Sequence, residues 1–380
     1  MKRFLSVLTV LLLAVTMMAG CAKNDTQEGA GSSGNTGNIG TEGTAGDTGN
    51  IGNEETAGDT GSTGVAGTVG NAGSSAAEGE AYEGVNIRLG GLKGPTSMGM
   101  VKLLDDAEQK KTVNSYEFTM AAMADELTPK LLKGELDILA VPANLGAILY
   151  NNSNGAVKMV AANALGVIYI VEKDGETVNS LADLKGKTIY GTGKGSTPEY
   201  ALSYLLSQAG LIPGEDVTVE WKSEPAEIVA QMATEKNSVA MLPQPYVTVA
   251  QGQLENLRVA LDLNDEWNKL DNGSAFVTAS LVVRSAFAEE HPEALAKFLE
   301  EYKASTDYVN QNIEAAAELV EKYDIVKAAV AKKAIPGCNI VCITGEEMKT
   351  MTEGYFKVLA DRNPAAVGGE LPKDDFYWEK

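Results

Sequence analysis

The chain has 380 residues, with 31 basic and 52 acidic side chains and a formal net charge of −21. Recognition of nucleic-acid phosphates requires a basic surface, so this charge argues against a nucleic-acid partner. The 40 glycines exceed the roughly 27 that an average usage of about 7% predicts. Of these, 17 lie between Ala22 and Gly84, where no proline occurs, whereas all 12 prolines lie at or beyond Pro95. The chain therefore consists of unlike parts.

The first 21 residues have the features of a secretory signal. Lys2 and Arg3 precede an apolar run that ends at Met18 and is too short to span a bilayer as a mature helix. The sequence Met18-Ala19-Gly20-Cys21 resembles a bacterial lipobox, in which the cysteine is diacylated and becomes the mature N-terminus. Two acyl chains hold a protein stably at a membrane. We expect an extracytoplasmic protein lipidated at Cys21; the alternative is an ordinary signal peptide with an incidental cysteine.

Residues 22–84 read as a disordered tether rich in glycine, threonine and asparagine. From Gly31 to Gly73 a glycine falls at every third position except at Glu55. Period-three glycine is the signature of collagen, so a trimeric stalk is an alternative, but collagen also needs abundant proline, which this tract lacks. A segment with so few large apolar residues cannot offset its ordering entropy.

Beyond residue 84, short apolar runs alternate with helical stretches, as is typical of an α/β protein. The first part predicts strands over 85–89, 116–120 and 136–141, and helices within 94–106 and over 125–133 and 143–150. The second part predicts strands over 166–173, 188–191, 217–221, 239–242 and 275–284, and helices over 198–209, 225–234 and 245–252. An acidic, alanine-rich helical tail is expected over 291–333. In 198–209 the apolar residues repeat at helical spacing, so that face belongs to the core.

Several segments resemble extracytoplasmic solute-binding proteins of ABC importers, in particular the group that handles nitrate, alkanesulfonates, taurine and thiamine precursors. The stretches that carry this resemblance are Asp183–Ile189, Gly193–Glu199, Gly94–Gly99, Leu136–Asn144 and Met241–Tyr246. The resemblance covers about 85–380. It implies a two-lobed fold of the periplasmic-binding-protein type II class, with lobe 1 at 85–164 and 277–380 and lobe 2 at 165–276. It also implies crossovers near 163–166 and 271–278.

Two glycine-bearing loops can be read for ligand chemistry directly. In Gly195-Ser196-Thr197-Pro198, Thr197 is suited to cap a helix and Pro198 suits the first helical turn. Unpaired backbone N–H groups at the positive end of a helix bind anions or strong hydrogen-bond acceptors. The segment Gly94–Ser97 is expected to present a similar helix end from the opposite lobe. The alternative for both loops is an ordinary cap.

We expect the solute to contact residues at the ends of strands in both lobes. The predicted ligand-binding residues are Lys93, Gly94, Thr96, Ser97, Asn144, Gly195, Ser196, Thr197, Gln244 and Tyr246. Each has an alternative role: Lys93 is simply solvated, Asn144 caps its short helix, and Gln244 and Tyr246 serve a turn or a helix cap.

Enzyme readings find little support in the sequence. The segment Gly191–Ser196 lacks the GxxxxGK[ST] spacing of a phosphate-binding loop. The single histidine, His291, excludes a multi-histidine metal centre, and no serine motif accompanies it for a Ser-His-Asp arrangement. We expect no enzyme activity, no cofactor and no metal. Cys338 and Cys342 are too few for a zinc site and are expected to be free, buried thiols.

These observations predict a membrane-anchored receptor that closes two lobes around a small solute, an organic anion or a thiamine-precursor-like molecule. It would deliver the solute to the permease and ATPase subunits of an ABC importer, and we expect it to be a monomer. Two alternatives stay open: a surface interaction protein displayed on a collagen-like stalk, and an extracytoplasmic synthase on the same scaffold.

Overall fold

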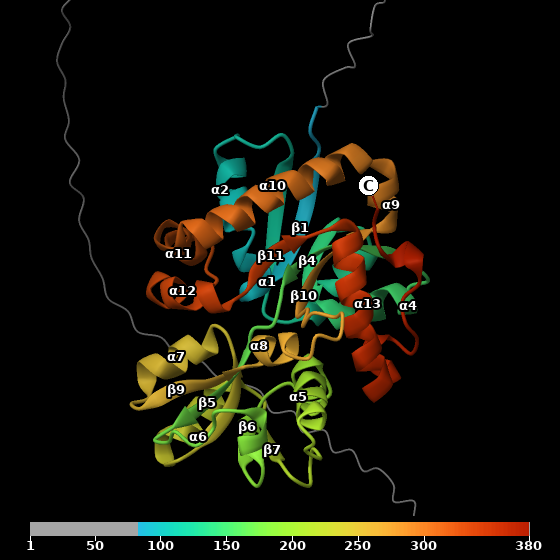
Figure 1. Cartoon of the computed structure of the whole chain (residues 1–380). Coiled ribbons are helices and arrows are strands. Elements are labelled where there is room, and N and C mark those ends of the chain that lie inside the picture. Colours follow the sequence, from blue (N-terminus) through green and yellow to red (C-terminus); the bar gives the residue numbers. More distant parts are fainter. Residues whose placement is uncertain (1–82, 380) are drawn as a thin grey trace, which may run out of the picture. The chain divides into compact units, whose positions relative to one another are not determined.

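A computed structural model describes residues 83–379, whose strands form two sheets (Figure 1). The first sheet has six strands in the order β11-β4-β10-β3-β1-β2. These strands are β1 (Asn86–Leu92), β2 (Ser115–Ala121), β3 (Ile138–Pro142), β4 (Val157–Ala164), β10 (Ala279–Arg284) and β11 (Ile340–Ile343). β1 runs parallel to β2 and β3, whereas β10 runs antiparallel to β3 and β4, so the sheet is mixed.

The second sheet has five strands in the order β7-β6-β8-β5-β9. They are β5 (Ile168–Lys173), β6 (Thr188–Gly191), β7 (Thr218–Trp221), β8 (Val239–Pro243) and β9 (Leu257–Asp262). β6 is parallel to β7 and β8, and β5 is antiparallel to β8 and β9. Each sheet therefore has three neighbouring parallel strands at one side and antiparallel pairs at the other.

Helices accompany the strands as expected for an α/β protein. They are α1 (Pro95–Met98), α2 (Val101–Glu108), α3 (Thr128–Leu132), α4 (Ala143–Asn152), α5 (Thr197–Gln208), α6 (Pro225–Thr234), α7 (Tyr246–Gln253), α8 (Leu263–Asn268), α9 (Ser285–Glu290), α10 (Pro292–Gln311), α11 (Ile313–Lys322), α12 (Ala328–Ala334) and α13 (Gly345–Arg362). Short 3₁₀ turns include η1 (Ala124–Glu126), η3 (Ile335–Gly337) and η4 (Pro364–Val367).

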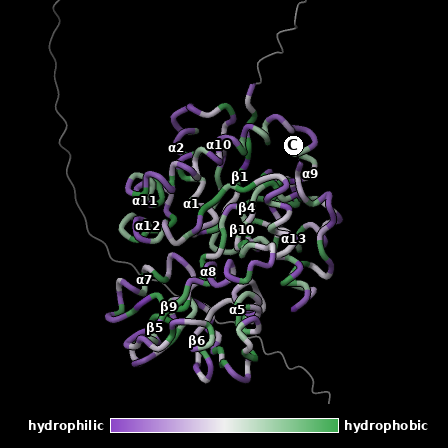
Figure 2. The backbone as a smooth tube through the Cα atoms, in the orientation of Figure 1, coloured by the Kyte–Doolittle hydropathy of each residue, from purple (hydrophilic) through white to green (hydrophobic). Residues whose placement is uncertain are grey.

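The burial pattern follows the hydropathy of each element. The first four residues of β3 are fully or almost fully buried, as expected for a central strand covered on both faces. In Figure 2 hydrophobic segments gather at the strands. In α5 the buried residues Ala201, Leu202, Leu205 and Leu206 follow helical spacing, so the predicted core face is confirmed.

The chain passes between the two sheets twice. It leaves the first sheet after Ala164 and enters the second at Ile168; it returns between Asn268 and Ala279. The two passages are joined by a hydrogen bond, because the Thr278 N–H donates to the Ala164 carbonyl at 3.0 Å. The division into two lobes at particular residues remains a prediction.

Most predicted elements occur near their expected bounds, but two predictions are wrong in part. The expected helix over 125–133 is the turn η1 followed by the short α3, and the expected helical tail over 291–333 is three helices, α10 to α12. The tail breaks at Asn312, where the backbone leaves the helical conformation, and again before Ala328. Six strands and helices were not predicted: β4, β9, α8, α9, β11 and α13.

The cysteine prediction is confirmed in part. Cys338 and Cys342 are both free, but only Cys338 is buried, whereas Cys342 in the edge strand β11 is half-buried. Burial raises the pKa of both thiols to about 12. The predicted signal, Cys21 and the glycine tract up to residue 82 lie outside the described residues. Within the described part of the chain, no helix is long and apolar enough to cross a membrane.

Candidate functional site

The loop between β6 and α5 contains two glycines with a left-handed backbone conformation. Gly193 and Gly195 have φ angles of 83° and 74°, in the left-handed region that favours glycine. Ser196 occupies the N-cap position of α5, and its hydroxyl donates to the Gly193 carbonyl at 2.7 Å. Thr197 is the first helical residue, so the prediction that Thr197 caps the helix is wrong. Pro198 lies in the first turn, as predicted.

The backbone amide of Gly195 already has a partner within α5. It donates to the Glu199 carboxylate at 2.5 Å, at an exposed position. A carboxylate in the first turn stabilises the positive end of a helix without any ligand. An anionic solute at this loop would therefore have to share the helix end with Glu199 or displace it.

Two predicted ligand residues from opposite sheets meet directly. The Thr197 hydroxyl, at the start of α5, donates to Asn144 Oδ1 at 3.1 Å, at the start of α4. The Asn144 amide in turn donates to the Ala366 carbonyl at 3.2 Å. Both side chains are buried, at 8% and 7% exposure for Asn144 and Thr197. The alternative that Asn144 caps α4 is wrong, because Pro142 occupies the cap position and Asn144 bonds elsewhere.

The loop after β1 is built differently from the loop after β6. The helix α1 that it opens is a single turn of four residues, whereas α5 has 12 residues. The Thr96 and Ser97 hydroxyls both donate to the Leu92 carbonyl, at 2.8 and 2.7 Å. Gly94 has a φ of 132°, and a Cβ there would meet no atom within 4 Å. Gly94 therefore faces open space, whereas the side chain of Ser97 is fully buried.

Asn163 holds the loop after β1 through a hydrogen bond. Its amide donates to the Thr96 carbonyl at 2.9 Å, and its side chain is fully buried at the end of β4. The sequence analysis named Asn163 only as the start of a crossover. Its contact with Thr96 joins the first crossover to the loop.

Lys93 lies at the surface beside the loop. Its ammonium pairs with the Asp324 carboxylate at 3.1 Å, and both side chains are well exposed. Such exposed pairs contribute little to stability and rearrange readily. Lys93 is therefore neither simply solvated nor held in the interior.

Gln244 and Tyr246 lie where β8 passes into α7. Gln244 is buried, and its Oε1 accepts from the Thr248 hydroxyl at 3.0 Å. Its amide faces Gly337 of the C-terminal region, where an added Cβ would lie 3.0 Å from Gln244 Nε2. Tyr246 begins α7 and is 37% exposed.

A polar cluster that the sequence did not reveal adjoins Gln244. The Tyr169 hydroxyl, from β5, donates to the Gly337 carbonyl at 2.8 Å. Asp262 of β9 stands opposite Tyr169 in the strand register. Burial raises the pKa of the Asp262 carboxyl, an effect that its hydrogen bond from the Asn264 amide opposes. This cluster forms a second polar contact between the second sheet and the C-terminal region.

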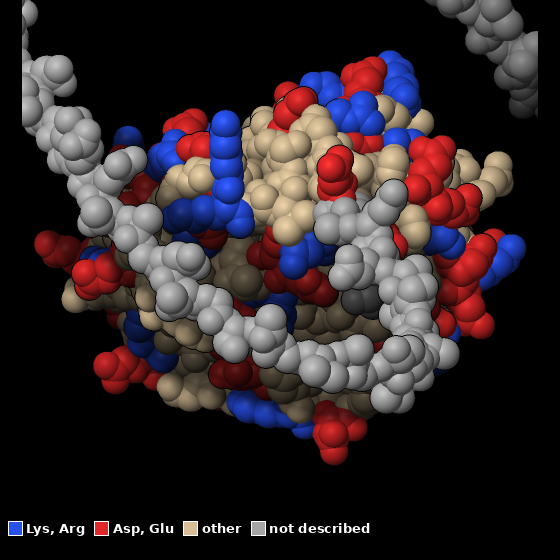
Figure 3. Space-filling view, turned by 90° about the horizontal axis from the view of Figure 1, so that it is seen from above, with Lys and Arg blue, Asp and Glu red and all other residues tan. Residues whose placement is uncertain are grey.

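Charges elsewhere on the described surface are mixed. On the face drawn in Figure 3, basic and acidic side chains lie among each other. Lys322, for example, pairs with Asp105 at 2.8 Å and with Glu108 at 2.7 Å. Among residues 83–379, no group of three or more histidine, cysteine or acidic side chains has the arrangement of a metal site.

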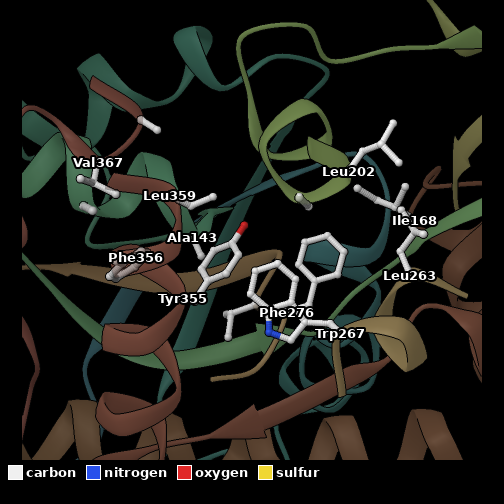
Figure 4. Packing of buried hydrophobic residues seen from close by; sticks show 14 of the residues in the cluster. Ala143, Ile168, Leu202, Leu263, Trp267, Phe276, Tyr355, Phe356, Leu359 and Val367 are labelled. Atoms are coloured by element: carbon white, nitrogen blue, oxygen red, sulfur yellow. The ribbon is translucent and has the colours of Figure 1, made fainter. Parts of the chain in front are cut away.

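An aromatic cluster adjoins Thr197 through Tyr355, and Figure 4 shows Trp267, Phe276 and Tyr355 packed together. Trp267 stacks on Phe276 at 5.2 Å between ring centroids, and Tyr355 of α13 meets Trp267 edge-on at 5.6 Å. The Tyr355 hydroxyl lies 3.5 Å from the Thr197 hydroxyl. The candidate site thus combines buried amide and hydroxyl groups with an adjoining aromatic cluster.

Comparison with known protein families finds a matching family model. The model of a family described as "ABC transporter, phosphonate, periplasmic substrate-binding protein" matches residues 100–334. The chain belongs to this family. It is thus a substrate-binding component of an ABC transporter, and the family is one of transport proteins. Comparison with curated proteins finds no match.

Several solved structures share the fold of this family member. An ABC transporter protein from Parabacteroides distasonis is 24% identical, with 77% of this chain and 99% of that chain covered and a TM-score of 0.66. The aliphatic sulphonate-binding protein SsuA from Escherichia coli is 17% identical, with 79% and 93% covered and a TM-score of 0.60. The nitrate-binding protein NrtA from Synechocystis PCC 6803 is 14% identical, with 77% and 83% covered and a TM-score of 0.53. The predicted periplasmic-binding-protein-like fold is confirmed.

Tyr355 of α13, which contacts Thr197 in the candidate site of this substrate-binding protein, was not expected from the sequence. The buried residues of α13, Met348, Thr352, Tyr355, Phe356 and Leu359, recur at helical spacing. That spacing was a usable signal for the helix. It gave no indication that Tyr355 would reach Thr197, because the contact joins residues 158 positions apart.

Proposed function

We propose that this substrate-binding protein captures a small solute between two lobes, at the starts of α4 and α5, and delivers it to the permease of an ABC importer. The observation that carries the proposal is the hydrogen bond between Asn144 and Thr197. It joins α4, which follows β3 of the first sheet, to α5, which follows β6 of the second sheet, and both residues are predicted ligand residues. Groups from both sides of a closing site allow a ligand to stabilise the closed state. Lipid anchoring at Cys21 and a monomeric state complete the proposal.

The solute that we infer is small and carries several hydrogen-bond acceptors. The family is described by phosphonate, SsuA by sulphonate and NrtA by nitrate, all of which are oxyanions. The Gly193–Thr197 loop carries backbone amides and hydroxyls, groups that bind such oxygens. The Ser196 and Thr197 hydroxyls would exchange their present acceptors, the Gly193 carbonyl and Asn144 Oδ1, for the solute. The Gly195 amide already donates to the Glu199 carboxylate, however, and this negative charge disfavours an anion. A neutral thiamine-precursor-like molecule is therefore retained as a candidate solute together with the organic anions. We expect no turnover of either.

A thermal-shift screen of the full-length protein tests this function. The probes are nitrate, methylphosphonate, an alkanesulfonate, taurine and an aminopyrimidine, each added to the same preparation. A ligand at about 100 times its dissociation constant stabilises the folded state by about 2.7 kcal/mol, which gives a clear rise in the midpoint. A shift with one class names the solute. The absence of any shift, with mass spectrometry detecting no co-purified solute, would contradict capture.

The glycine loop can then be tested with a matched pair of variants. Gly195 and Gly186 have similar φ angles, 74° and 76°, and an added Cβ at either meets no atom within 4 Å. Gly195→Ala and Gly186→Ala should therefore share a similar strain cost, about 1–2 kcal/mol. The two glycines flank opposite ends of β6. We expect Gly195→Ala alone to weaken binding of the identified probe, by about tenfold, in calorimetry. Equal affinities for the two variants would remove the loop from the site.

A further inference from the structure

The end of α13 lies along one face of α5. Tyr355 approaches Thr197, the Asn363 amide donates to the Tyr200 hydroxyl at 2.9 Å, and the Arg362 guanidinium lies 5.8 Å from the centre of the Tyr204 ring. The three α5 positions are separated by three and four residues, so they share one helical face. Figure 1 shows α13 running from the region of the first sheet towards α5.

The segment that follows α13 is held by α4. Asn144 donates to the Ala366 carbonyl at 3.2 Å, and Asn151 donates to the Val367 and Glu370 carbonyls at 2.7 Å. Residues 144 and 151 are two helical turns apart and therefore lie on the same face of α4. The C-terminal segment 345–370 thus contacts both helices whose starts carry the candidate site.

Tyr200 connects this segment to the glycine loop. Its hydroxyl accepts from Asn363 and donates to the Gly195 carbonyl at 3.0 Å. The N–H of the same residue, Gly195, is taken by Glu199. The peptide groups on both sides of Gly195 are therefore fixed by α5, and Asn363 fixes the side chain that holds one of them.

We propose that the C-terminal segment 345–370 is a clasp between α4 and α5, and that Tyr200 and Asn363 are positioning residues of the glycine loop. The clasp stabilises the closed arrangement before solute arrives. Because apparent affinity scales with the populated fraction of the binding-competent state, the clasp would raise the affinity for solute. That consequence rests on the proposed function, whereas the clasp itself does not.

Hydrogen exchange of the full-length protein, without added solute, tests the clasp. Tyr200→Phe removes the hydroxyl and keeps the ring. Asn363→Ser removes the amide but keeps an oxygen that can accept from the Ala365 N–H, as Asn363 does now. We expect amide exchange in residues 193–197 to accelerate by about 2- to 10-fold in Tyr200→Phe, the range that loss of one net hydrogen bond allows. In Asn363→Ser we expect a smaller local effect, because the bond from Tyr200 to Gly195 remains.

The control variant is Lys357→Gln, which removes an exposed ion pair with Asp361 on the same helix and touches neither α4 nor α5 through a hydrogen bond. It should leave exchange in 193–197 unchanged. Unchanged exchange in Tyr200→Phe, or a uniform acceleration that includes the core strand β3, would overturn the proposal, since the second result indicates only a loss of global stability. If Tyr200→Phe does not fold, Asn363→Ser decides: faster exchange confined to residues 193–197 supports the proposal, and unchanged exchange there overturns it. The exchange experiment uses no solute, so its outcome does not depend on whether the thermal-shift screen finds one.

Discussion

Asp137 is a buried carboxylate that joins three segments of the first sheet. Its side chain is 2% exposed, and its Oδ1 lies 2.5 Å from Arg88 Nη2 and 2.9 Å from Arg284 Nη2. Its Oδ2 also accepts from the Arg88 backbone amide at 3.0 Å. Burial alone would raise the pKa of Asp137, but the hydrogen bonds from both arginines outweigh that effect and hold the pKa below its usual value of 3.8. The carboxylate is therefore charged throughout the physiological range.

We predict that Asp137→Asn lowers the free energy of unfolding by about 2–3 kcal/mol at pH 7. Removing one partner of a buried ion pair costs about 3–5 kcal/mol, and the value is smaller here because the Arg88 side chain is 36% exposed. Urea denaturation measures the difference. The control is Asp361→Asn, whose pair with Lys357 is 65% exposed on both sides and should contribute less than about 1 kcal/mol. Similar losses in the two variants would contradict a special role for Asp137.

The same carboxylate predicts a pH dependence with a definite sign. Its pKa is lower in the folded chain than in the unfolded chain, so its contribution is complete well above pH 3.8 and is lost as pH falls through that value towards the folded pKa. The stability difference between wild type and Asp137→Asn should therefore shrink between pH 6 and pH 3. Denaturation curves at both pH values measure it. A difference that grows on acidification would contradict the assigned direction.

At the scale of elements, α13 approaches the second crossover closely at one glycine. A Cβ on Gly354 would lie 2.7 Å from Ser274 Cβ and 3.2 Å from Ser274 Cα, which is closer than packed atoms approach. Alanine normally stabilises a helix relative to glycine by up to about 1 kcal/mol. At position 354, a Cβ would clash with Ser274, so alanine is expected to be less stable than glycine there.

We predict opposite effects for two glycine-to-alanine substitutions in helices. Gly354→Ala should lower the free energy of unfolding by about 1–3 kcal/mol, the usual cost of overpacking. Gly252→Ala, in α7, should leave stability unchanged or raise it by up to about 1 kcal/mol, because a Cβ there meets no atom within 4 Å. Thermal or urea unfolding of both variants measures the difference. A stabilising Gly354→Ala would show that α13 does not approach the crossover this closely.

Local sequence patterns predicted the elements whose ends are marked by glycine or proline, and missed elements without such markers. Strand β6 has the predicted bounds, 188–191, and α6 has the predicted bounds, 225–234, because glycine and proline mark their ends. Strand β4 was missed because its sequence, VKMVAANA, is rich in alanine and is buried almost throughout, so it shows no alternation. In α13 the threonines and Gly354 obscured a helical spacing that the buried residues do possess.

The sequence predicted which loops and residues form the candidate site, but not which of these residues bond to one another. The loops after β1 and β6 and the start of α4 were found from glycine, proline and strand ends, and Asn144 and Thr197 prove to be neighbours. Thr96 and Ser97 turned out to bond to Leu92, and Glu199 to the Gly195 amide, because local hydrogen bonds within a loop depend on its backbone path. Tyr355 and Asn363 reach the site through contacts that no local pattern encodes.

At the scale of the whole described unit, one hydrophobic core continues from sheet to sheet. It includes Leu139 and Val141 of β3 together with Ile170 of β5 and Met241 of β8. Trp267 joins the two sides, since its ring lies 4.9 Å from that of Tyr204 and also contacts Phe276 and Tyr355. Buried apolar contacts of this kind couple the stabilities of the elements that share them.

We predict that the two sheets unfold as one cooperative unit. In native-state hydrogen exchange, the slowest amides of β3 and of β8 should then report the same free energy of opening, within about 1 kcal/mol, and the same dependence on urea. Trp267→Leu should separate the two values, because it removes the ring that links the aromatic groups across the junction. A control substitution of the exposed Leu132, Leu132→Ala, should leave them equal. If β8 opens with a free energy several kcal/mol below that of β3 in the wild-type chain, the sheets unfold independently and the shared core does not couple them.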